Sequence, residues 1–241
     1  DHRDLHSFPT RRSSDLLWYL LKKIYDKGLL YKGYSIQPYS PSDGTGLSSH
    51  ELNQPGCYKD VTDTTATVQF EILRDAKSEP LFEGADVSVY FLAWTTTPWT
   101  LVSNTALCIG PRFDYIRVLS FNPYTGQKAV YVLAKELLGA WFNPKAADIP
   151  LEDYKPGDKL VPYKVLDGAF KGADLVGIRY AQLIPWFKPV EDGEPFRVIS
   201  GDYVTTEDGT GIVHIAPTFG ADDKRVATAA GIVGIMPVDR D

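Results

Sequence analysis

The sequence predicts a mostly β fold with a few helices, arranged as a closed or nearly closed β-barrel. Many short runs of apolar, β-branched and aromatic residues are joined by irregular connections rich in Gly and Pro. Strands and helices do not alternate regularly, as they would in a doubly wound α/β sheet. The chain has 241 residues, of which 44% are hydrophobic and 23% charged, and this suffices for one good-sized core.

The N-terminal region predicts one amphipathic helix followed by a long connection. Apolar side chains recur on one helical stripe: Leu17, Leu20, Leu21, Ile24 and Tyr25. Ser14 or Asp15 is suited to cap the start of this helix, and Gly28 its end. A short strand is expected in LYKGYSIQPYS, and residues 40–60, rich in Ser, Gly, Pro and Asp, predict a long loop.

The rest of the chain predicts strands and two short helices. Residues 66–73 alternate between apolar and polar side chains, whereas residues 86–94 are more continuously apolar, as in a central strand. Further strands are expected at 106–110, 115–121, 128–134, 196–200 and 209–216. The second and third of these flank the loop NPYTGQ, which predicts a hairpin. Helices are expected at 135–142 and 221–231.

Composition makes several classes of protein improbable. The net charge is −6, and no basic run is visible that would suit a freestanding nucleic-acid binder. No apolar run approaches the roughly 20 residues that span a bilayer. Cys57 and Cys108 form no Cys-x-x-Cys pair, so we expect two reduced thiols and no structural zinc.

Residues 94–100, WTTTPWT, place many hydroxyl groups at the end of an apolar strand. The plainer interpretation is β-propensity, because Thr is common in strands and pairs across a sheet. However, Pro98 cannot continue a ladder of backbone hydrogen bonds. A bend at this point would leave hydroxyl and backbone groups available to a polar ligand or to an attacking water.

A second cluster lies in GTGIVHIAPTFGADD, residues 209–223. His214 ends a predicted strand, and Asp222 and Asp223 begin a predicted helix, where carboxylates suit the helix dipole. A core histidine and simple helix caps are the plainer interpretations. The alternative is that the strand-end His and a helix-start Asp converge on one pocket.

Other chemistries find less support in this cluster. A metal site built from His214, Asp222 and Asp223 lacks a second nearby His, and we expect no metal. A serine hydrolase using Ser103 with His214 lacks a Gly-x-Ser-x-Gly turn. A phosphate-binding GxxxxGK[ST] loop is missing from the sequence.

The two clusters resemble motifs of one family. WTTTPWTLVSN resembles the threonine-rich motif of the editing domain of isoleucyl-tRNA synthetases, and GTGIVHIAPTFGADD resembles the second editing motif of that domain. Residues 39–52 and 58–70 look like the segment that this family carries just before the domain. The related valyl and leucyl enzymes carry an Arg in the threonine-rich segment, followed by an acidic residue. This chain has a Thr and a Trp there.

The resemblance covers roughly residues 17–235 and implies the β-barrel editing domain of the valyl, isoleucyl and leucyl enzymes. We expect residues 1–16 to be an unassigned tail or a segment foreign to the rest of the chain, so that His2 and His6 carry no functional weight. By resemblance, residues 17–55 are a remnant of the catalytic domain or connecting stem, and residues 56–235 are the editing domain.

The implied function is hydrolytic proofreading of valyl-tRNA(Ile). Valine is one methylene smaller than isoleucine, and one methylene gives about 1–3 kcal/mol of discrimination between two substrates. Isoleucyl-tRNA synthetases are themselves the standard example of this limit. By resemblance, the catalytic residues are Thr95, Thr96, Thr97, Thr100 and Asn104, and the substrate-binding residues are Trp94, His214 and Asp223. His214 would exclude the extra methyl of isoleucine, and Asp223 would bind the α-ammonium group.

The resemblance also implies partners and a compartment. The partners are the aminoacylated 3′ end of tRNA(Ile) and the other domains of a parent synthetase, in the cytoplasm and without a membrane. Editing needs no cofactor, and ATP belongs to an aminoacylation site whose motifs this chain lacks, since its only Met is Met236. Two alternatives stay open: an idle module that binds the tRNA end or braces the parent enzyme, and an unrelated small-molecule hydrolase.

Overall fold

The computed structural model describes residues 8–32, 35–189 and 193–238. The chain separates into two compact units, Asp1–Ser35 and Ile36–Asp241. The division predicted at residue 56, between a stem and an editing domain, stays a prediction. His2 and His6, which are expected to carry no functional weight, lie outside the described residues.

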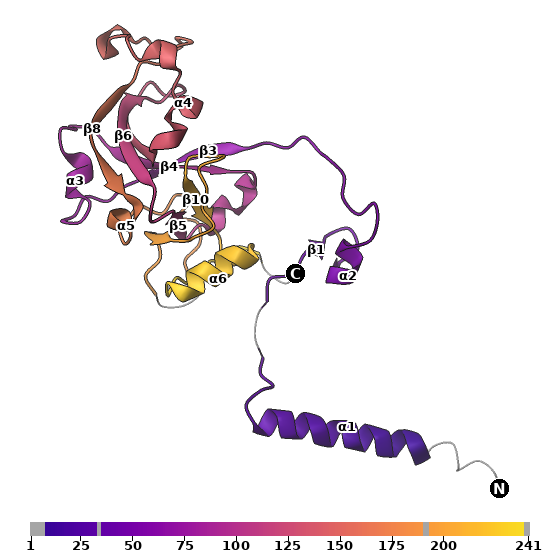
Figure 1. Cartoon of the computed structure of the whole chain (residues 1–241). Helices are drawn as coiled ribbons and strands as arrows, with labels where there is room; N and C mark the ends of the chain where they lie inside the picture. Colours follow the sequence, from indigo (N-terminus) through magenta and orange to yellow (C-terminus); the bar gives the residue numbers. More distant parts are fainter. Residues whose placement is uncertain (1–7, 33–34, 190–192, 239–241) are drawn as a thin grey trace. The chain divides into compact units, whose positions relative to one another are not determined.

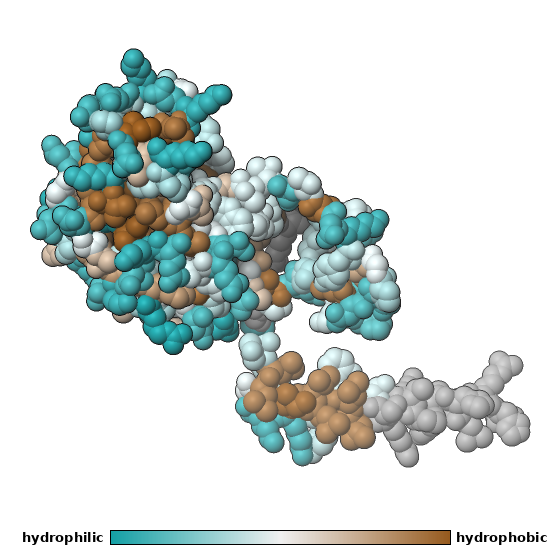
Figure 2. Space-filling view, turned by 45° about the horizontal axis from the view of Figure 1, so that its top comes forward, coloured by the Kyte–Doolittle hydropathy of each residue, from teal (hydrophilic) through white to brown (hydrophobic). Residues whose placement is uncertain are grey.

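The first unit holds one long helix, α1, Phe8–Asp26. The predicted start at Ser14 or Asp15 is wrong, because the helix already begins at Phe8. Pro9 is compatible with this start, since it falls in the first turn, where its missing N–H breaks no helical hydrogen bond. The predicted end is confirmed: Gly28 has φ +69°, and its N–H donates to the carbonyl of Tyr25 over 2.8 Å. Figure 2 shows apolar side chains along this helix. Leu17 and Trp18 are among the exposed apolar residues of this unit.

The predicted loop at residues 40–60 contains small elements of its own. Strands β1, Tyr39–Ser40, and β2, Thr45–Gly46, form a two-residue antiparallel pair. Among the described residues of the expected strand in LYKGYSIQPYS, strand structure is limited to β1. Helix α2, Ser49–Leu52, begins with a capping box in which Ser48 and Glu51 satisfy each other's backbone N–H groups.

The remaining strands form one eight-stranded sheet, and the predicted mostly β fold is confirmed. The strands are β3 Ala66–Glu71, β4 Val89–Thr95, β5 Ala106–Ile109, β6 Asp114–Phe121, β7 Lys128–Ala134, β8 Lys164–Lys171, β9 Arg197–Ser200 and β10 Ile212–Ile215. Their order is β8-β6-β7-β4-β10-β5-β9, with β3 paired to β4. Figure 1 shows this sheet, with β3, β4, β5, β6, β8 and β10 labelled. The predicted hairpin is β6–β7, which pair antiparallel.

The sheet curls into a partly closed barrel, so the predicted nearly closed barrel is confirmed. One edge of β4 pairs with β3, and the other pairs first with β7 and then with β10. Residues 177–181 link β9 back to the end of β3. Tyr180 N–H donates to the carbonyl of Phe196 over 2.9 Å, and Ala181 N–H donates to that of Glu71 over 2.8 Å.

Short helices and turns decorate this barrel. They are α3 Glu79–Phe82, α4 Leu138–Trp141, α5 Gly172–Leu175 and α6 Ala221–Ala229, with 3₁₀ turns η1 Pro98–Ser103, η2 Lys135–Leu137, η3 Pro144–Ala146 and η4 Leu151–Asp153. The helix predicted at 221–231 is α6, and the one predicted at 135–142 is η2 followed by α4. Among the described residues, no helix has the length and apolar character needed to cross a membrane.

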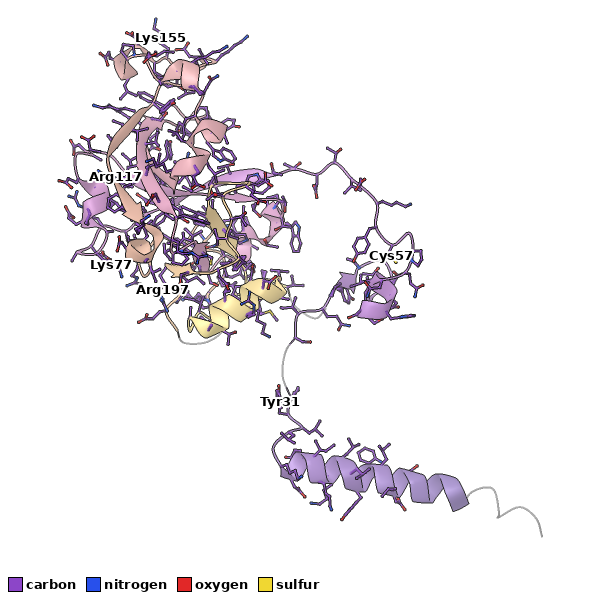
Figure 3. The ribbon with its side chains drawn as sticks, in the orientation of Figure 1. Tyr31, Cys57, Lys77, Arg117, Lys155 and Arg197 are labelled. Carbon is purple, nitrogen blue, oxygen red and sulfur yellow. The ribbon has the colours of Figure 1, made fainter. Side chains whose placement is uncertain are left out.

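Apolar side chains fill the barrel, with one buried cation among them. The main core includes Phe70, Phe91, Tyr115 and Ile212, each nearly or fully buried. Arg117 of β6, labelled in Figure 3, donates to the carbonyls of Pro80 in α3, of Glu83 at the end of α3 and of Asp167 in β8. Its guanidinium thereby satisfies backbone acceptors where α3 and β8 meet the sheet.

Candidate functional site

The two motif segments leave the barrel at neighbouring positions. Strand β4 ends at Thr95, and β10 carries His214 near its own end. β10 runs parallel to β4, with Val213 paired to Trp94, and lies between β4 and β5 (Figure 1). Because parallel neighbours end at the same edge of a sheet, the threonine-rich bend and the loop before α6 emerge side by side.

A cavity of about 450 Å³ lies between these segments. Seven of the eight predicted site residues line it: Trp94, Thr95, Thr96, Thr97, Thr100, His214 and Asp223. Asn104 is the exception, because it is 2% exposed and does not belong to the lining. The structure thus brings both motifs to one cavity.

The threonine hydroxyls organise their own bend. Thr95 Oγ1 accepts from the Thr97 backbone N–H over 3.0 Å, and the Thr100 hydroxyl donates to the Thr97 carbonyl over 2.8 Å. Thr96 is exposed, and its hydroxyl makes no hydrogen bond with any described residue. These contacts lie within the bend that leads from β4 into η1 and not between facing strands, so β-propensity alone does not account for the cluster.

His214 is held at both ring nitrogens. Its Nε2 lies 2.9 Å from Thr100 Oγ1, and its Nδ1 lies 2.9 Å from Asn104 Nδ2. Burial lowers the pKa of His214 to about 4, so the ring is neutral near pH 7. His214 is a hydrogen-bonded buried histidine, and it also forms part of the cavity wall.

The structure separates the two neighbouring carboxylates at the start of α6. Asp222 is exposed and its carboxylate lies 3.4 Å from Arg225, whereas Asp223 is half-buried and faces the cavity. Asp223 Oδ2 accepts from the Ala216 backbone N–H over 2.9 Å, outside the helix. Burial raises the pKa of Asp223, which means that its charge lacks full compensation.

Two glycines line the cavity just before β10. Gly209 and Gly211 have φ near +72° and +73°, and this is why β10 starts at Ile212 and not at the predicted residue 209. A Cβ on Gly211 would lie 2.4 Å from Ala134 Cβ. The Gly209 carbonyl accepts from Trp141 Nε1 over 2.6 Å, which fixes this loop against α4.

Sequence reasoning missed several lining residues. Trp99 and Phe219 lie inside the two motifs, and their rings meet edge to face at 5.1 Å. Tyr203, Thr205 and Asp208 also line the cavity, from the loop before Gly209. Their nearness in sequence to the second motif was the available signal, because DYVTTEDGTG has no pattern typical of a site.

Two alternatives can be compared with this geometry. The Ser103 hydroxyl is buried and donates to the Ile235 carbonyl over 3.0 Å, so it is not poised beside His214 as a nucleophile. Within the described residues, no group of three His, Cys, Asp or Glu side chains is placed to bind a metal ion.

Comparison with known proteins shows the family. No family model matches the chain. Its sequence is 62% identical over 238 residues to isoleucine–tRNA ligase of Bacteroides thetaiotaomicron, covering 95% of this chain and 20% of that protein. The chain matches a segment of the isoleucine–tRNA ligases. The same enzyme of Bacteroides fragilis is 65% identical over 229 residues, with the same coverage, so the resemblance seen in the motifs is confirmed.

The chain spans about a fifth of the length of these curated relatives. Among solved structures, it is similar to GlLeuRS-CP1, with a TM-score of 0.47 and 18% identity over 68% of this chain and 59% of that one. The editing domain of P. knowlesi cytosolic leucyl-tRNA synthetase gives 0.46 and 14%, over 66% and 60%. Because both scores lie below 0.5, the family assignment rests on the sequences alone.

Proposed function

We propose that this isoleucine–tRNA ligase segment proofreads by hydrolysing valyl-tRNA(Ile). The observation that carries the proposal is the meeting of both motifs at one cavity. Its volume of about 450 Å³ falls within the roughly 300–1,000 Å³ of small-ligand pockets. The cavity thus has room for an amino-acid ester with its ribose.

Asp223 is the group that best suits the α-ammonium of the bound amino acid. It faces the cavity, and in the described structure its carboxylate accepts one backbone N–H while keeping other lone pairs free. A cation bound here would offset the burial that raises the pKa of Asp223. We therefore assign the amino group of the ester to the α6 side of the cavity.

The threonine-rich bend suits the ester and the attacking water. Water adds to the ester carbonyl carbon, the bond from that carbon to the ribose oxygen breaks, and valine and uncharged tRNA are released. The hydroxyl of Thr96 and the polar groups around Thr95 and Thr97 can orient that water and the terminal nucleoside. Because water is the nucleophile, no protein nucleophile is required. A hydroxyl of the terminal ribose takes part in the proton transfer.

His214 supplies size selection in this proposal. A neutral, buried ring held at both nitrogens is a rigid wall, and it does not move aside at low cost. The extra methyl of an isoleucyl ester would have to displace the ring and break its hydrogen bonds. A valyl ester avoids this clash, so the cavity hydrolyses the smaller product.

The reaction as proposed needs neither a metal nor another cofactor, and ATP serves only the aminoacylation site of a parent enzyme. The body of the tRNA would be held by other domains of that enzyme, consistent with the net charge of −6 of this chain. We place the reaction in the cytoplasm, where tRNA is charged.

Loss of the ester bond tests the proposal against its alternatives. The 241-residue chain is incubated with valyl-tRNA(Ile), isoleucyl-tRNA(Ile) and valine methyl ester, and release of free amino acid is followed. We expect acceleration over buffer with valyl-tRNA(Ile) only. Binding without acceleration would indicate the idle module, and equal cleavage of the methyl ester would indicate an unrelated small-molecule hydrolase.

A further inference from the structure

A chain of buried polar contacts runs from the closure of the barrel to the cavity wall. The Tyr180 hydroxyl donates to Asn104 Oδ1 over 2.7 Å. Asn104 Nδ2 donates to the Ala106 carbonyl over 2.9 Å and lies 2.9 Å from His214 Nδ1. Tyr180, Asn104 and His214 are 1%, 2% and 6% exposed, so water has little access to these contacts.

The direction of every hydrogen bond in this chain follows from one acceptor. A backbone carbonyl can only accept, so the amide group that faces Ala106 is the NH₂ group of Asn104. The second hydrogen of that NH₂ then points to His214 Nδ1, which must be an unprotonated acceptor. A neutral imidazole carries one proton, and it therefore resides on Nε2, toward Thr100 Oγ1.

The same orientation leaves Asn104 Oδ1 pointing into the core, where Tyr180 is its partner. Tyr180 lies in the 177–181 segment that closes the barrel, and its ring meets Phe70 edge to face at 5.3 Å. Its neighbour Phe196 has φ 60°, a backbone conformation that a bulky residue adopts only where the surroundings fix it. Barrel closure thus places this hydroxyl where the amide needs a donor.

We propose that Tyr180 and Asn104 are positioning residues that fix His214 as the neutral tautomer protonated on Nε2. Tyr180 satisfies Oδ1, the Ala106 carbonyl orients the NH₂ group, and the NH₂ group fills Nδ1. His214 Nε2–H donates to Thr100 Oγ1, and the Thr100 hydroxyl donates to the Thr97 carbonyl.

The hydrogen-bonded chain Tyr180–Asn104–His214, called the relay below, gives His214 a structural role in substrate selection. It gives the ring no role in proton transfer. Nδ1 accepts one hydrogen bond from Asn104 and Nε2 uses its proton on Thr100, so neither nitrogen is free to take a proton from water. The ring is instead locked in plane and rotamer at the cavity wall. This part of the inference rests on the proposed function, whereas the tautomer itself does not.

The tautomer is measurable by nitrogen-15 NMR of the imidazole rings in the 241-residue chain at pH 7. The His214 signals are identified among the four histidines by their loss in His214→Gln. We expect Nε2 in the range of protonated nitrogens and Nδ1 in that of unprotonated ones. The reverse assignment, or an average of the two tautomers, would overturn the proposal.

Two variants test the relay itself. Asn104→Asp replaces the donor facing Nδ1 with an acceptor, so the proton should move to Nδ1 and the two nitrogen signals should exchange ranges. Tyr180→Phe keeps the ring but leaves Oδ1 without a donor, so the Nε2–H tautomer should lose its dominance and the signals should move toward their average. Unchanged signals in both variants would contradict the relay.

A matched control removes a buried hydroxyl elsewhere. Tyr131 of β7 is 3% exposed, and its hydroxyl accepts from Gln69 away from the cavity. Tyr131→Phe should leave the His214 signals unchanged. A shift equal to that of Tyr180→Phe would mean that Tyr180 acts only through packing of the core and not through its hydrogen bond to Asn104. If valyl-tRNA(Ile) is hydrolysed, Tyr180→Phe should narrow the preference for valine over isoleucine by about 3- to 10-fold. If it is not hydrolysed while the signals behave as expected, the relay stands and the proposed function fails.

Discussion

The two sides of the cavity treat a buried polar group in opposite ways. On the β10 side, both nitrogens of His214 have partners, and burial lowers its pKa to about 4, so the ring stays uncharged. On the α6 side, Asp223 accepts one backbone N–H, and burial raises its pKa by more than this hydrogen bond lowers it. The first side is complete without a ligand and selects by shape, whereas the second has unmet capacity for a positive charge.

Removing the carboxylate is the strongest way to break this contrast. In Asp223→Ala, the ammonium group of the ester loses a charge-assisted partner in a half-buried site, which is worth about 3 kcal/mol. Hydrolysis of valyl-tRNA(Ile) should therefore fall by about 100-fold, measured as kcat/KM. Asp222→Ala is the matched control, since Asp222 is exposed and lies outside the lining, and it should change the rate by less than about 2-fold. Equal losses in both variants would make Asp223 a helix-start carboxylate and no more.

The neutral histidine should make stability depend on pH. The unfolded chain binds a proton on this ring below about pH 6.5, but the folded chain binds it only near pH 4, so stability falls as pH drops through that window. The loss is at most about 3 kcal/mol, and Asp223 works against it because its raised folded pKa favours proton uptake by the folded state. The contribution of the ring is isolated by measuring the free energy of unfolding of the wild type and of His214→Gln, by denaturant, between pH 7 and 4.5. If this free energy changes with pH equally in both proteins, the ring titrates normally.

Removing the His214 side chain from the cavity wall should change the preference for valyl over isoleucyl ester more than it changes the rate of valyl ester hydrolysis. In His214→Ala, the wall that excludes the isoleucyl methyl is gone, and one methyl in an apolar pocket corresponds to about 1–3 kcal/mol. The rate ratio of valyl- to isoleucyl-tRNA(Ile) hydrolysis should therefore fall by about 10-fold or more, mainly because isoleucyl ester becomes a substrate. A preserved ratio would assign the filter to another lining residue.

The strands could be read from the sequence because local pattern and final pairing agree. The strand predicted at residues 128–134 has the same first and last residues as β7. Its hairpin with β6 follows from the short loop between the two strands. Both motifs were visible in the same way, as runs of unusual residue types at strand ends. Their meeting at one edge, however, depends on the parallel pairing of β10 with β4 across more than a hundred residues, which no local pattern specifies.

Tyr180 shows where sequence reasoning stops. It lies 76 residues from Asn104, in a Pro- and Gly-rich region without a clear period, and it joins the barrel through isolated bridges and not through a strand. Its role exists only once the barrel has closed. The start of α1 was missed for a different reason, since FPTRRSS lacks an apolar stripe but contains no residue that prevents a helix beyond its first turn.

The smallest expected effect separates a paired hydroxyl from an unpaired one within the same bend. Thr100 Oγ1 is buried between His214 and the Thr97 carbonyl, so Thr100→Val should lower the free energy of unfolding by about 1–2 kcal/mol. Thr96 is exposed and has no described partner, so Thr96→Val should change it by less than about 0.5 kcal/mol. Chemical denaturation measures both changes.

If Thr96→Val nevertheless slows hydrolysis, the loss arises from a contact with the substrate or its water, because the fold itself is unaffected. If Thr96→Val destabilises the chain as much as Thr100→Val, the bend depends on all its hydroxyls, and the distinction between a prebuilt wall and a ligand-binding surface does not hold within the threonine cluster.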